Sequence, residues 1–553
     1  MRDAFSRVSD GPPHRQDPRN LRGRQRAPGN VLVTLILVYA AAFRLITLNR
    51  PFHYDDEATG GAFYGILARN YLRIPWSESH GIPVLTVGRL SDAPLAFYPD
   101  HPPLVPLLIS PLYWVFGVGE WQTRLVTSIA TVLAIAVLYA LVRRFGNRRT
   151  ALTTAALFAA SPMVLHFGGQ AEVLGMPLVL FALLTIHAYL SFHREPGGPA
   201  FARLIGAFVL AAISDWPAFI LAPVLVVHFV ATQPSRQWQW MLAFCTCAGV
   251  VFASLYLFIA VAAHLPWDWM VPLVKGRSAI GVKAPFTARE WLRIAWLFNR
   301  HCHTLPLVAA ASSWAVVAGV SVRRGQPGAA VARLLLAWGM LHVLIGRQGV
   351  YNHEWWWWPL TPGIACASGL LAESTLLRFE RHGSSWIPSA VLIVTVAAFT
   401  AWTTVKEYRE LYPPPQDGQF TTLDLGRAIQ AAAPGANDLA MLAWSGQDPE
   451  LWFYGDRALR TDIWSIDDFE ARLSGPDADL AFGYVQPWPA RAAGLVLPVS
   501  SIGTMPGLHT YLSARYRFAS LPRELADKFE VFDLRSERIS RSNAEAAKDA
   551  KGR

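Results

Sequence analysis

The sequence is poor in charge and in cysteine. Of its 553 residues only 16% are charged, whereas 53% are hydrophobic and the mean hydropathy is +0.27. One soluble core of this length would bury far less apolar material, which excludes an ordinary soluble protein. The four cysteines have neither a zinc-binding spacing nor the pattern of a disulfide framework, and we assign no chemical role to Cys245, Cys247, Cys302 or Cys366.

Long apolar runs recur between Val31 and Trp402, with arginine clusters between them. A helix that crosses the hydrocarbon core of a bilayer needs roughly 20 mainly apolar residues. The sequence therefore predicts an all-α polytopic membrane protein with about eleven transmembrane helices. We place them near residues 31–49, 121–142, 150–166, 173–192, 204–214, 217–231, 241–263, 304–322, 329–346, 358–372 and 386–404.

The net charge of +10 is better explained by membrane topology than by nucleic-acid binding. Much of the basic excess lies between Arg2 and Arg26 and in short loops between apolar runs. Cytoplasmic loops carry such an excess, and one orientation satisfies every cluster if the N-terminus is cytoplasmic. The apolar stretch 104–116 is then a re-entrant or interfacial helix rather than a span. We expect a multi-pass protein of the inner (plasma) membrane.

Four regions follow from this topology. We expect residues 1–30 to form a disordered basic cytoplasmic tail, and residues 31–405 to form a transmembrane domain with a large first external loop at 50–120. Residues 406–535 alternate short apolar runs with Gly, Pro and Asp, which is typical of a small α/β domain, here on the external (periplasmic) side. Residues 536–553 are charged and poor in aromatics, and we expect them to be disordered.

The strongest local signal is the segment His53-Tyr54-Asp55-Asp56-Glu57, directly after the first predicted span. A solvated loop that ends the helix would also explain an acidic triplet. However, residues 60–72 are small, aromatic and apolar, and we expect them to form an interfacial helix that holds the triplet at the bilayer boundary. A carboxylate held there is a candidate general base.

The same loop ends in Tyr98-Pro99-Asp100-His101-Pro102-Pro103. Asp100 and His101 thus precede the short apolar segment, and the prolines restrict the approach of the chain. A proline-capped helix start with incidental polar residues is an equally good explanation from periodicity alone. His101 is a candidate phosphate ligand.

With these two motifs the chain resembles the lipid-carrier-dependent glycosyltransferases of the GT-C fold, especially the aminoarabinose transferases and the protein O-mannosyltransferases. In that superfamily an Asp-Glu pair follows the first span, and an acidic-basic-Pro motif closes the first loop. Asp56-Glu57 and Asp100-His101-Pro102 match those places. The resemblance implies that Asp56 is the base that activates the acceptor hydroxyl, with Asp55 as its rival. The basic position is a lysine in aminoarabinose transferases, from which His101 departs.

Two further acids lie at external positions of the superfamily; Glu172 matches the residue type found there, and Asp215 departs from it. Glu172 follows Ser161-Pro162 and Gln170-Ala171, where relatives carry an acid at the outer end of the fourth span. An acid at a helix start is otherwise a favourable partner for the helix dipole. Asp215 breaks an apolar run, where many relatives have a lysine before the proline. An ordinary turn and a substrate contact remain equal explanations for Asp215.

Two later external segments carry candidate ligands of an anionic donor. Tyr351 to Pro359 contains four tryptophans, which suit an interfacial belt, while Arg347, His353 and Glu354 need polar surroundings and are expected to face the cavity. Arg347 is a candidate phosphate ligand. The loop 264–303 carries Lys275 and Arg277, which fit a mobile lid and a snorkelling interfacial segment equally well.

The sequence and the resemblance together predict an inverting glycosyltransferase that uses a polyprenyl-phosphate sugar on the external face. The expected partners are that donor, the membrane and an acceptor hydroxyl on a lipid, glycan or protein, without nucleic acid. We expect no cofactor and no required metal. The alternatives are a transporter or lipid flippase, disfavoured because the acids lie at one face and no repeat is visible, and a non-catalytic cell-envelope scaffold.

Overall fold

The structure is a computed structural model of the chain. It describes residues 27–52, 57–88, 94–171, 175–232, 238–281, 283–320, 326–381, 387–413, 420–435, 437–444, 449–480, 484–488 and 490–536. Within these ranges, the side chains of residues 27–29, 57–60, 318–320 and 381 are not described.

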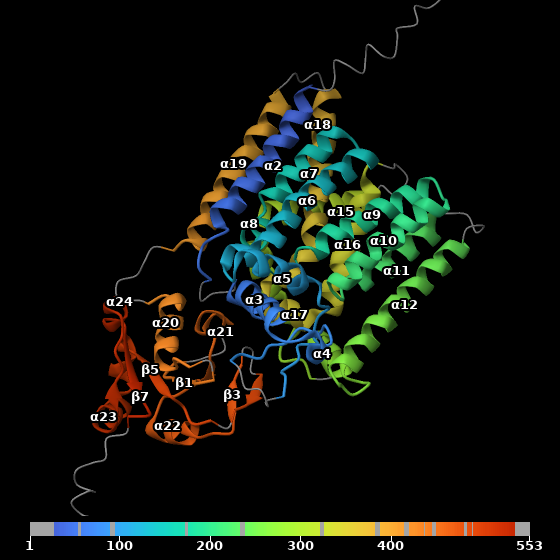
Figure 1. Cartoon of the computed structure of the whole chain (residues 1–553). Helices are drawn as coiled ribbons and strands as arrows, with labels where there is room; N and C mark the ends of the chain where they lie inside the picture. Colours follow the sequence, from blue (N-terminus) through green and yellow to red (C-terminus); the bar gives the residue numbers. More distant parts are fainter. Residues whose placement is uncertain are drawn as a thin grey trace, which may run out of the picture.

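A helical bundle forms the larger part of the molecule (Figure 1). Its long helices are built from the apolar runs of the sequence, and short helices occupy the loops between them. The helices are α2 (Ala27–Thr47), α3 (Glu57–Arg73), α4 (Trp76–Ser79), α5 (Leu104–Phe116), α6 (Glu120–Phe145), α7 (Arg148–Ala159), α8 (Pro162–Phe167), α9 (Leu178–Arg194), α10 (Gly198–Ser214), α11 (Ala218–Thr232), α12 (Trp238–Ala262), α13 (Met270–Ser278), α14 (Ala288–Cys302), α15 (Leu305–Val320), α16 (Ala329–Ile345), α17 (Arg347–Asn352), the 3-10 helix η2 (Glu354–Leu360), α18 (Thr361–Arg381) and α19 (Ile387–Leu411).

Apolar helices long enough to cross a membrane are present in the described part of the chain. There are five of them: Asn30–Thr47, Glu120–Phe145, Trp238–Ala262, Glu354–Glu380 and Ile387–Leu411. Six more apolar helices have 10 to 17 residues. The protein is therefore a multi-pass membrane protein, while the count of eleven spans stays a prediction. The predicted span 150–166 is divided into α7 and α8, because Ser161 caps a new helix that starts at Pro162.

The bundle has a buried centre and an apolar exterior. Helices α6, α9 and α18 are largely buried, whereas almost the whole apolar surface of α19 faces outward. Helix α19 runs beside α2 along one edge of the bundle (Figure 1), where Tyr39 and Thr404 share a hydrogen bond of 2.7 Å. Outward apolar side chains are the pattern expected of lipid-facing helices.

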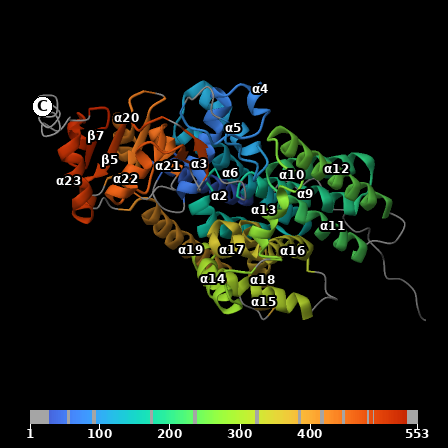
Figure 2. The same ribbon diagram turned by 90° about the horizontal axis from the view of Figure 1, so that it is seen from below.

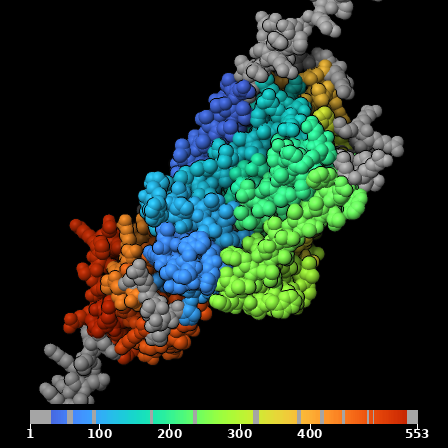
Figure 3. Space-filling view, turned by 45° about the vertical axis from the view of Figure 1, so that its right-hand side comes forward, coloured from blue at the N-terminus to red at the C-terminus, as the bar shows by residue number. Residues whose placement is uncertain are grey.

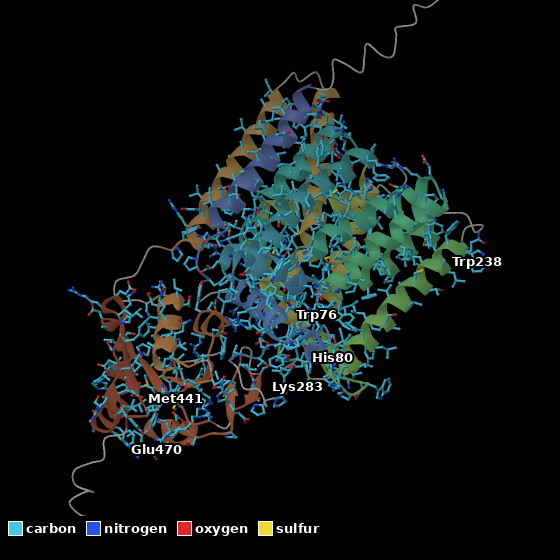
Figure 4. The ribbon with its side chains drawn as sticks, in the orientation of Figure 1. Trp76, His80, Trp238, Lys283, Met441 and Glu470 are labelled. Carbon is cyan, nitrogen blue, oxygen red and sulfur yellow. The ribbon has the colours of Figure 1, made fainter. Side chains whose placement is uncertain are left out.

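Helix α12 extends across the bundle. Trp238 at its beginning lies far from His80 and Lys283 (Figure 4). Its last residue, Ala262, accepts a hydrogen bond from the His80 ring, since their atoms are 3.2 Å apart. The loop between α2 and α5 and the segment after α12 therefore lie at the same end of the bundle.

The first loop contains α3, and this helix differs from the interfacial helix that we predicted. The helix itself is confirmed, but residues 61–71 are buried rather than placed at a lipid surface. Gly61 and Gly65 allow the close packing: a Cβ on Gly61 would lie 2.4 Å from the Phe52 ring, and one on Gly65 would lie 2.7 Å from the Phe453 ring. Protein, not lipid, covers the apolar faces of α3.

The residues after α19 form a sheet with helices on its faces (Figures 1 and 2). Strands β1 (Leu439–Leu442), β2 (Ala458–Arg460), β3 (Asp477–Asp479), β4 (Val485–Pro487), β5 (Gly494–Pro498), β6 (Arg517–Phe518) and β7 (Phe529–Asp533) have the order β4-β3-β2-β1-β5-β7-β6. Strand β1 is parallel to β2 and β5, and the remaining pairs are antiparallel. The helices are α20 (Thr422–Ala432), α21 (Pro449–Gly455), α22 (Ile466–Leu473), α23 (Pro506–Arg515) and α24 (Arg523–Ala526), with the 3-10 helix η4 (Val499–Thr504) after β5.

This sheet region is attached to the bundle through α3 and α21. Arg69 donates hydrogen bonds to the carbonyl oxygens of Trp452 and Phe453, at 3.2 and 3.0 Å, at the C-terminal end of α21. Arg73 binds the Asp456 carboxylate through both of its terminal nitrogens, at 2.7 and 2.6 Å. Cations at a helix C-terminus and bidentate ion pairs both fix orientation. In the space-filling view the first loop lies between the sheet region and α12 (Figure 3).

Candidate active site

Two cavities meet at the end of the bundle that carries the first loop. The first has a volume of about 260 Å³ and a wall of aromatic and charged side chains from α3, the end of the first loop, α13, η2 and the sheet region. These are Phe63, Tyr64, Tyr98, Asp100, His101, Arg277, His353, Trp355, Trp356 and Tyr484. The second cavity, of about 270 Å³, lies between α11, α12, α13 and α16, and its wall is mostly apolar.

The two cavities share one group of residues. Asp100, His101, Arg277 and Trp356 line both of them. The apolar cavity continues from this group past Phe219, Ile220, Phe252, Leu273 and Val274. An apolar chamber and an aromatic, polar chamber thus join at a point where two basic side chains lie.

His101 is held by a buried carboxylate. Its Nδ1 atom lies 2.8 Å from Oδ1 of Asp215, whose side chain is fully buried at the end of α10. The backbone amide of Trp216 donates to the same oxygen at 2.8 Å. Burial lowers the pKa of His101, but the charge of Asp215 and its hydrogen bond outweigh burial, so that the pKa lies above the usual value. The fold therefore favours the imidazolium form of His101.

Asp215 contacts His101 and itself lines the apolar cavity, while its role as a substrate contact stays a prediction. A solvated turn would leave the carboxylate in water, whereas here it is buried against a cavity residue, and its Oδ2 atom has no hydrogen-bond partner among the described residues. Sequence reasoning placed His101 and Asp215 separately and did not predict that they are paired.

Arg277 is the second cation of the site. One of its terminal nitrogens lies 3.8 Å from Oδ2 of Asp100, and its guanidinium carbon lies 5.4 Å from the centre of a Trp356 ring. A guanidinium over an aromatic face keeps its charge and its remaining N–H donors. Asp100 is fixed in turn, because its carbonyl oxygen accepts a hydrogen bond of 2.8 Å from the Trp216 indole.

Arg347 supports Arg277 rather than lining either cavity. Its Nε and one terminal nitrogen donate to the carbonyl oxygens of Ser278 and Ala279, both at 2.8 Å. These carbonyls directly follow Arg277 at the C-terminal end of α13. Our prediction of Arg347 as a phosphate ligand does not fit this geometry, because its Nε and one terminal nitrogen donate to the backbone and it lines neither cavity.

Three other predicted ligands have different surroundings. His353 lines the aromatic cavity, where its ring stacks on Trp355 with centres 4.5 Å apart. Burial, with a smaller effect of Arg277, lowers the pKa of His353 to about 4, so this imidazole is neutral. Glu354 points away from both cavities and contacts His301 at 2.7 Å. Lys275 is exposed and lines neither cavity.

The sheet region contributes a residue that sequence analysis did not find. Tyr484, just before β4, lines the aromatic cavity and shares a hydrogen bond with Asp100. Burial and the Asp100 carboxylate raise the pKa of the Tyr484 phenol. No local motif marks this tyrosine, because its place in the site depends on how the sheet region is attached to α3.

The predicted catalytic acids lie at the edge of the described chain. Asp55, Asp56 and Glu172 lie outside the described residues, and Glu57 begins α3 with its side chain undescribed. Phe63 and Tyr64 of the cavity wall follow Glu57 on the same helix. Phe63 lies six positions after Glu57, which is about 9 Å along the helix.

The chain immediately before the acidic segment is fixed on all sides. The Phe52 side chain is fully buried, and its amide donates to the Tyr454 hydroxyl at 2.8 Å. The Phe52 carbonyl accepts a hydrogen bond of 2.6 Å from Thr422, and the Arg124 guanidinium lies 4.5 Å above its ring. Tyr454 and Thr422 belong to the sheet region, which therefore helps to set where the acidic segment begins.

A bundle of this topology, with a helical first loop and a sheet region attached to it, is the GT-C fold of membrane glycosyltransferases, and our prediction of this fold is confirmed. Residues 100–267 match the family model described as dolichyl-phosphate-mannose-protein mannosyltransferase. That segment begins at Asp100 and includes His101 and Asp215. No curated protein matches the chain.

Solved structures of low sequence identity share the fold over most of the chain. ArnT from Cupriavidus metallidurans bound to undecaprenyl phosphate is 15% identical, with a TM-score of 0.60, over 92% of this chain and 98% of that one. The oligosaccharyltransferase of Archaeoglobus fulgidus in the apo form is 12% identical, with a TM-score of 0.56, over 90% and 73% of the two chains. The archaeal AglB from the same organism, in complex with an inhibitory peptide and a dolichol-phosphate, is 12% identical, with a TM-score of 0.53, over 88% of this chain and 72% of that one.

Proposed function

We propose that the protein is an inverting glycosyltransferase that transfers a sugar from a polyprenyl-phosphate donor to an acceptor hydroxyl at the external face of the plasma membrane. The observation that carries this proposal is the junction of the two cavities at His101 and Arg277. The apolar cavity, the two cations and the aromatic cavity follow one another in the order of the three parts of a polyprenyl-phosphate sugar: an apolar tail, a phosphate and a polar ring.

The apolar cavity suits the lipid portion of the donor. Its aromatic and aliphatic wall offers a chain burial from water without competing polar groups. The neighbouring aromatic cavity suits a sugar ring, because ring faces pack on sugar C–H groups while Asp100, Tyr484 and neutral His353 provide hydrogen-bonding groups. ArnT binds undecaprenyl phosphate and AglB a dolichol-phosphate, both isoprenoid phosphates.

The phosphate is assigned to His101 and Arg277. A phosphate monoester becomes the leaving group, and its negative charge grows as the bond to the sugar breaks. The imidazolium of His101, stabilised by Asp215, and the guanidinium of Arg277 are placed where that charge would form. Two fixed cations supply this stabilisation in the proposed step, which requires no metal ion.

The proposed base is Asp56, with Asp55 as the alternative. The acceptor hydroxyl attacks the anomeric carbon on the face opposite the phosphate, and the carboxylate takes the hydroxyl proton. One carbon–oxygen bond forms as the bond to the phosphate oxygen breaks, and polyprenyl phosphate leaves. A single displacement of this kind inverts the anomeric configuration. Glu57 remains a further candidate catalytic acid, and Glu172 a candidate substrate-binding residue.

The test is transfer from radiolabelled polyprenyl-phosphate sugars by the purified protein in lipid, with a membrane extract as the acceptor source. Arg277→Ala should reduce transfer strongly and weaken binding of polyprenyl phosphate itself, whereas Lys275→Ala, two residues away and exposed, should change neither. Asp56→Asn should abolish transfer while donor binding remains; the same loss in Asp55→Asn alone would reassign the base.

Two results would contradict the proposed transfer activity. A folded protein that binds no polyprenyl phosphate, or that moves a lipid-linked sugar between leaflets without transferring it, would contradict the enzymatic proposal. The second outcome would favour the flippase alternative.

A further inference from the structure

A second group of polar side chains lies apart from the two cavities, where α8, α14, η2 and α19 meet. Glu354 is the first residue of η2, and His301 and Cys302 end α14. The sequence places His301 and Glu354 more than fifty residues apart, so their contact exists only in the folded chain. None of these residues lines the cavities of the proposed active site.

Three different donor atoms converge in this group. The Nδ1 atom of His301 lies 2.7 Å, and the Sγ atom of Cys302 lies 3.6 Å, from the same carboxylate oxygen of Glu354. The three ligand atoms all lie within 4.8 Å of one another. Cys302 is 1% exposed as a residue and the Glu354 side chain 8% exposed, so both are buried, while the imidazole is partly exposed. One imidazole, one thiol and one carboxylate form a donor set that zinc accepts.

The spacing is close to that of a tetrahedral zinc site. With Zn–S near 2.3 Å and Zn–O near 2.1 Å, a tetrahedral angle separates sulfur and oxygen by about 3.6 Å, and nitrogen and oxygen by about 3.4 Å. The observed Sγ···Oε2 distance fits this value. The imidazole would have to move outward by about 0.7 Å, which is a small change for a side chain at the end of a helix.

The outer contacts of His301 have the arrangement found behind metal-bound histidines. Its other nitrogen, Nε2, lies 3.2 Å from a carboxylate oxygen of Glu410 on α19. Glu410 is in turn paired with Lys406, at 3.2 Å. A carboxylate that accepts the second N–H of a ligating imidazole fixes the ring so that its first nitrogen faces the metal. Glu410 and Lys406 therefore act as positioning residues, not as ligands.

We propose that His301, Cys302 and Glu354 bind one Zn²⁺ ion, with the fourth position taken by water, and that this ion fixes the start of η2. The proposed zinc ligands line neither of the two cavities, and the ion does not enter the proposed transfer step. Its effect on the enzyme is mechanical, since Glu354 stands between His353 and Trp355, which both line the aromatic cavity. A metal bound at Glu354 would hold these two neighbours in place.

The test measures metal rather than activity. The full-length protein, purified in detergent without chelator and dialysed against metal-free buffer, should contain about one zinc per chain by elemental analysis. Cys302→Ser, His301→Ala and Glu354→Gln should each lower the content to near zero. Glu410→Gln should weaken zinc binding by roughly ten- to hundredfold while the site remains, as expected for a carboxylate behind a ligand.

Cobalt substitution adds a readout specific to the thiol. Protein loaded with Co²⁺ should show a thiolate-to-cobalt charge-transfer band, absent in Cys302→Ser and retained in Cys366→Ser. Cys366 is the matched control, because it is also fully buried but lies elsewhere, in α18. The Cys302→Ser change is small, so this pair stays informative if Glu354→Gln does not fold.

Three results would overturn the proposal. Folded wild-type protein that contains no zinc and takes up none at micromolar concentrations would show that the group is only an ion pair between His301 and Glu354. Full zinc content in Cys302→Ser and Glu354→Gln would place the metal elsewhere. Zinc lost in Glu407→Gln but kept in His301→Ala would assign it to the neighbouring group of His166, Glu407 and Glu410.

Discussion

The pairing of His101 with Asp215 predicts a particular pH dependence of transfer. Asp215→Asn keeps the shape of the side chain, and its amide oxygen still accepts from the Trp216 amide, but the negative charge is lost. A hydrogen bond to a charged group contributes about 1.5–3 kcal/mol, which corresponds to a loss of about tenfold to hundredfold in kcat/KM if the imidazolium binds the phosphate of the transition state.

The sign of the pH effect follows from the direction of the pKa shift. The pKa of His101 is raised in the folded protein, so the cation persists to a higher pH than a free imidazole, and activity should fall as pH rises through this raised pKa. Without the Asp215 charge, the pKa decreases, and the alkaline fall in kcat/KM should begin at a lower pH. His101→Lys should extend activity to higher pH, since a lysine titrates near 10.

The assay is the pH profile of kcat/KM for a radiolabelled polyprenyl-phosphate sugar, with Asp268→Asn as the control. Asp268 lies in a different segment, between α12 and α13, where it is exposed and lines neither cavity. Thermal unfolding of each variant separates loss of charge from loss of fold. If Asp215→Asn has lower activity at every pH with an unchanged alkaline limb, Asp215 has only a structural role and the reasoning about His101 is wrong.

Other contacts give sharper or simpler tests. Tyr454→Phe should leave the buried Phe52 amide without its acceptor, which costs about 1–3 kcal/mol of stability, measured by thermal unfolding. The same change should lower kcat in the transfer assay more than it weakens donor binding in a titration. Gly61→Ala should destabilise by a similar 1–3 kcal/mol, because its Cβ would overlap the Phe52 ring, while Gly206→Ala, with open space around it, should not. Arg347→Ala should raise KM for the donor, because Arg277 is displaced. The increase should be smaller than in Arg277→Ala, which removes the cation itself.

The membrane class and the fold were accessible from the sequence, because both depend on local composition. Twenty-residue apolar runs have few alternatives to a membrane helix, and short motifs at the ends of those runs identified the GT-C fold. The apolar stretch 104–116 is a helix with those bounds in the structure, since Pro103 and Gly117 flank it and give clear end signals.

The arrangement of charged side chains was less accessible. Asp215 and His101 are more than a hundred residues apart, and a sequence pattern gives no information on which of several loop carboxylates will reach a given histidine. Arg347 and Arg277 illustrate the same limit, because both appear as external arginines in the sequence, but one binds backbone carbonyls and the other lines the cavity. Residues 60–72 are predicted from the sequence to form an interfacial helix, yet α3 is buried against α5, α6 and α21.

The sequence by itself determined that this is a multi-pass membrane protein, that its apolar runs form helices, and which fold class it has, since hydrophobicity and end signals act over a few residues. The tertiary structure alone decided which charges are paired, that Tyr484 of the sheet region lines the site, and that His301, Cys302 and Glu354 come together. Those contacts depend on the packing of elements that are distant in the chain, and packing is fixed by the shape of whole surfaces rather than by any local pattern.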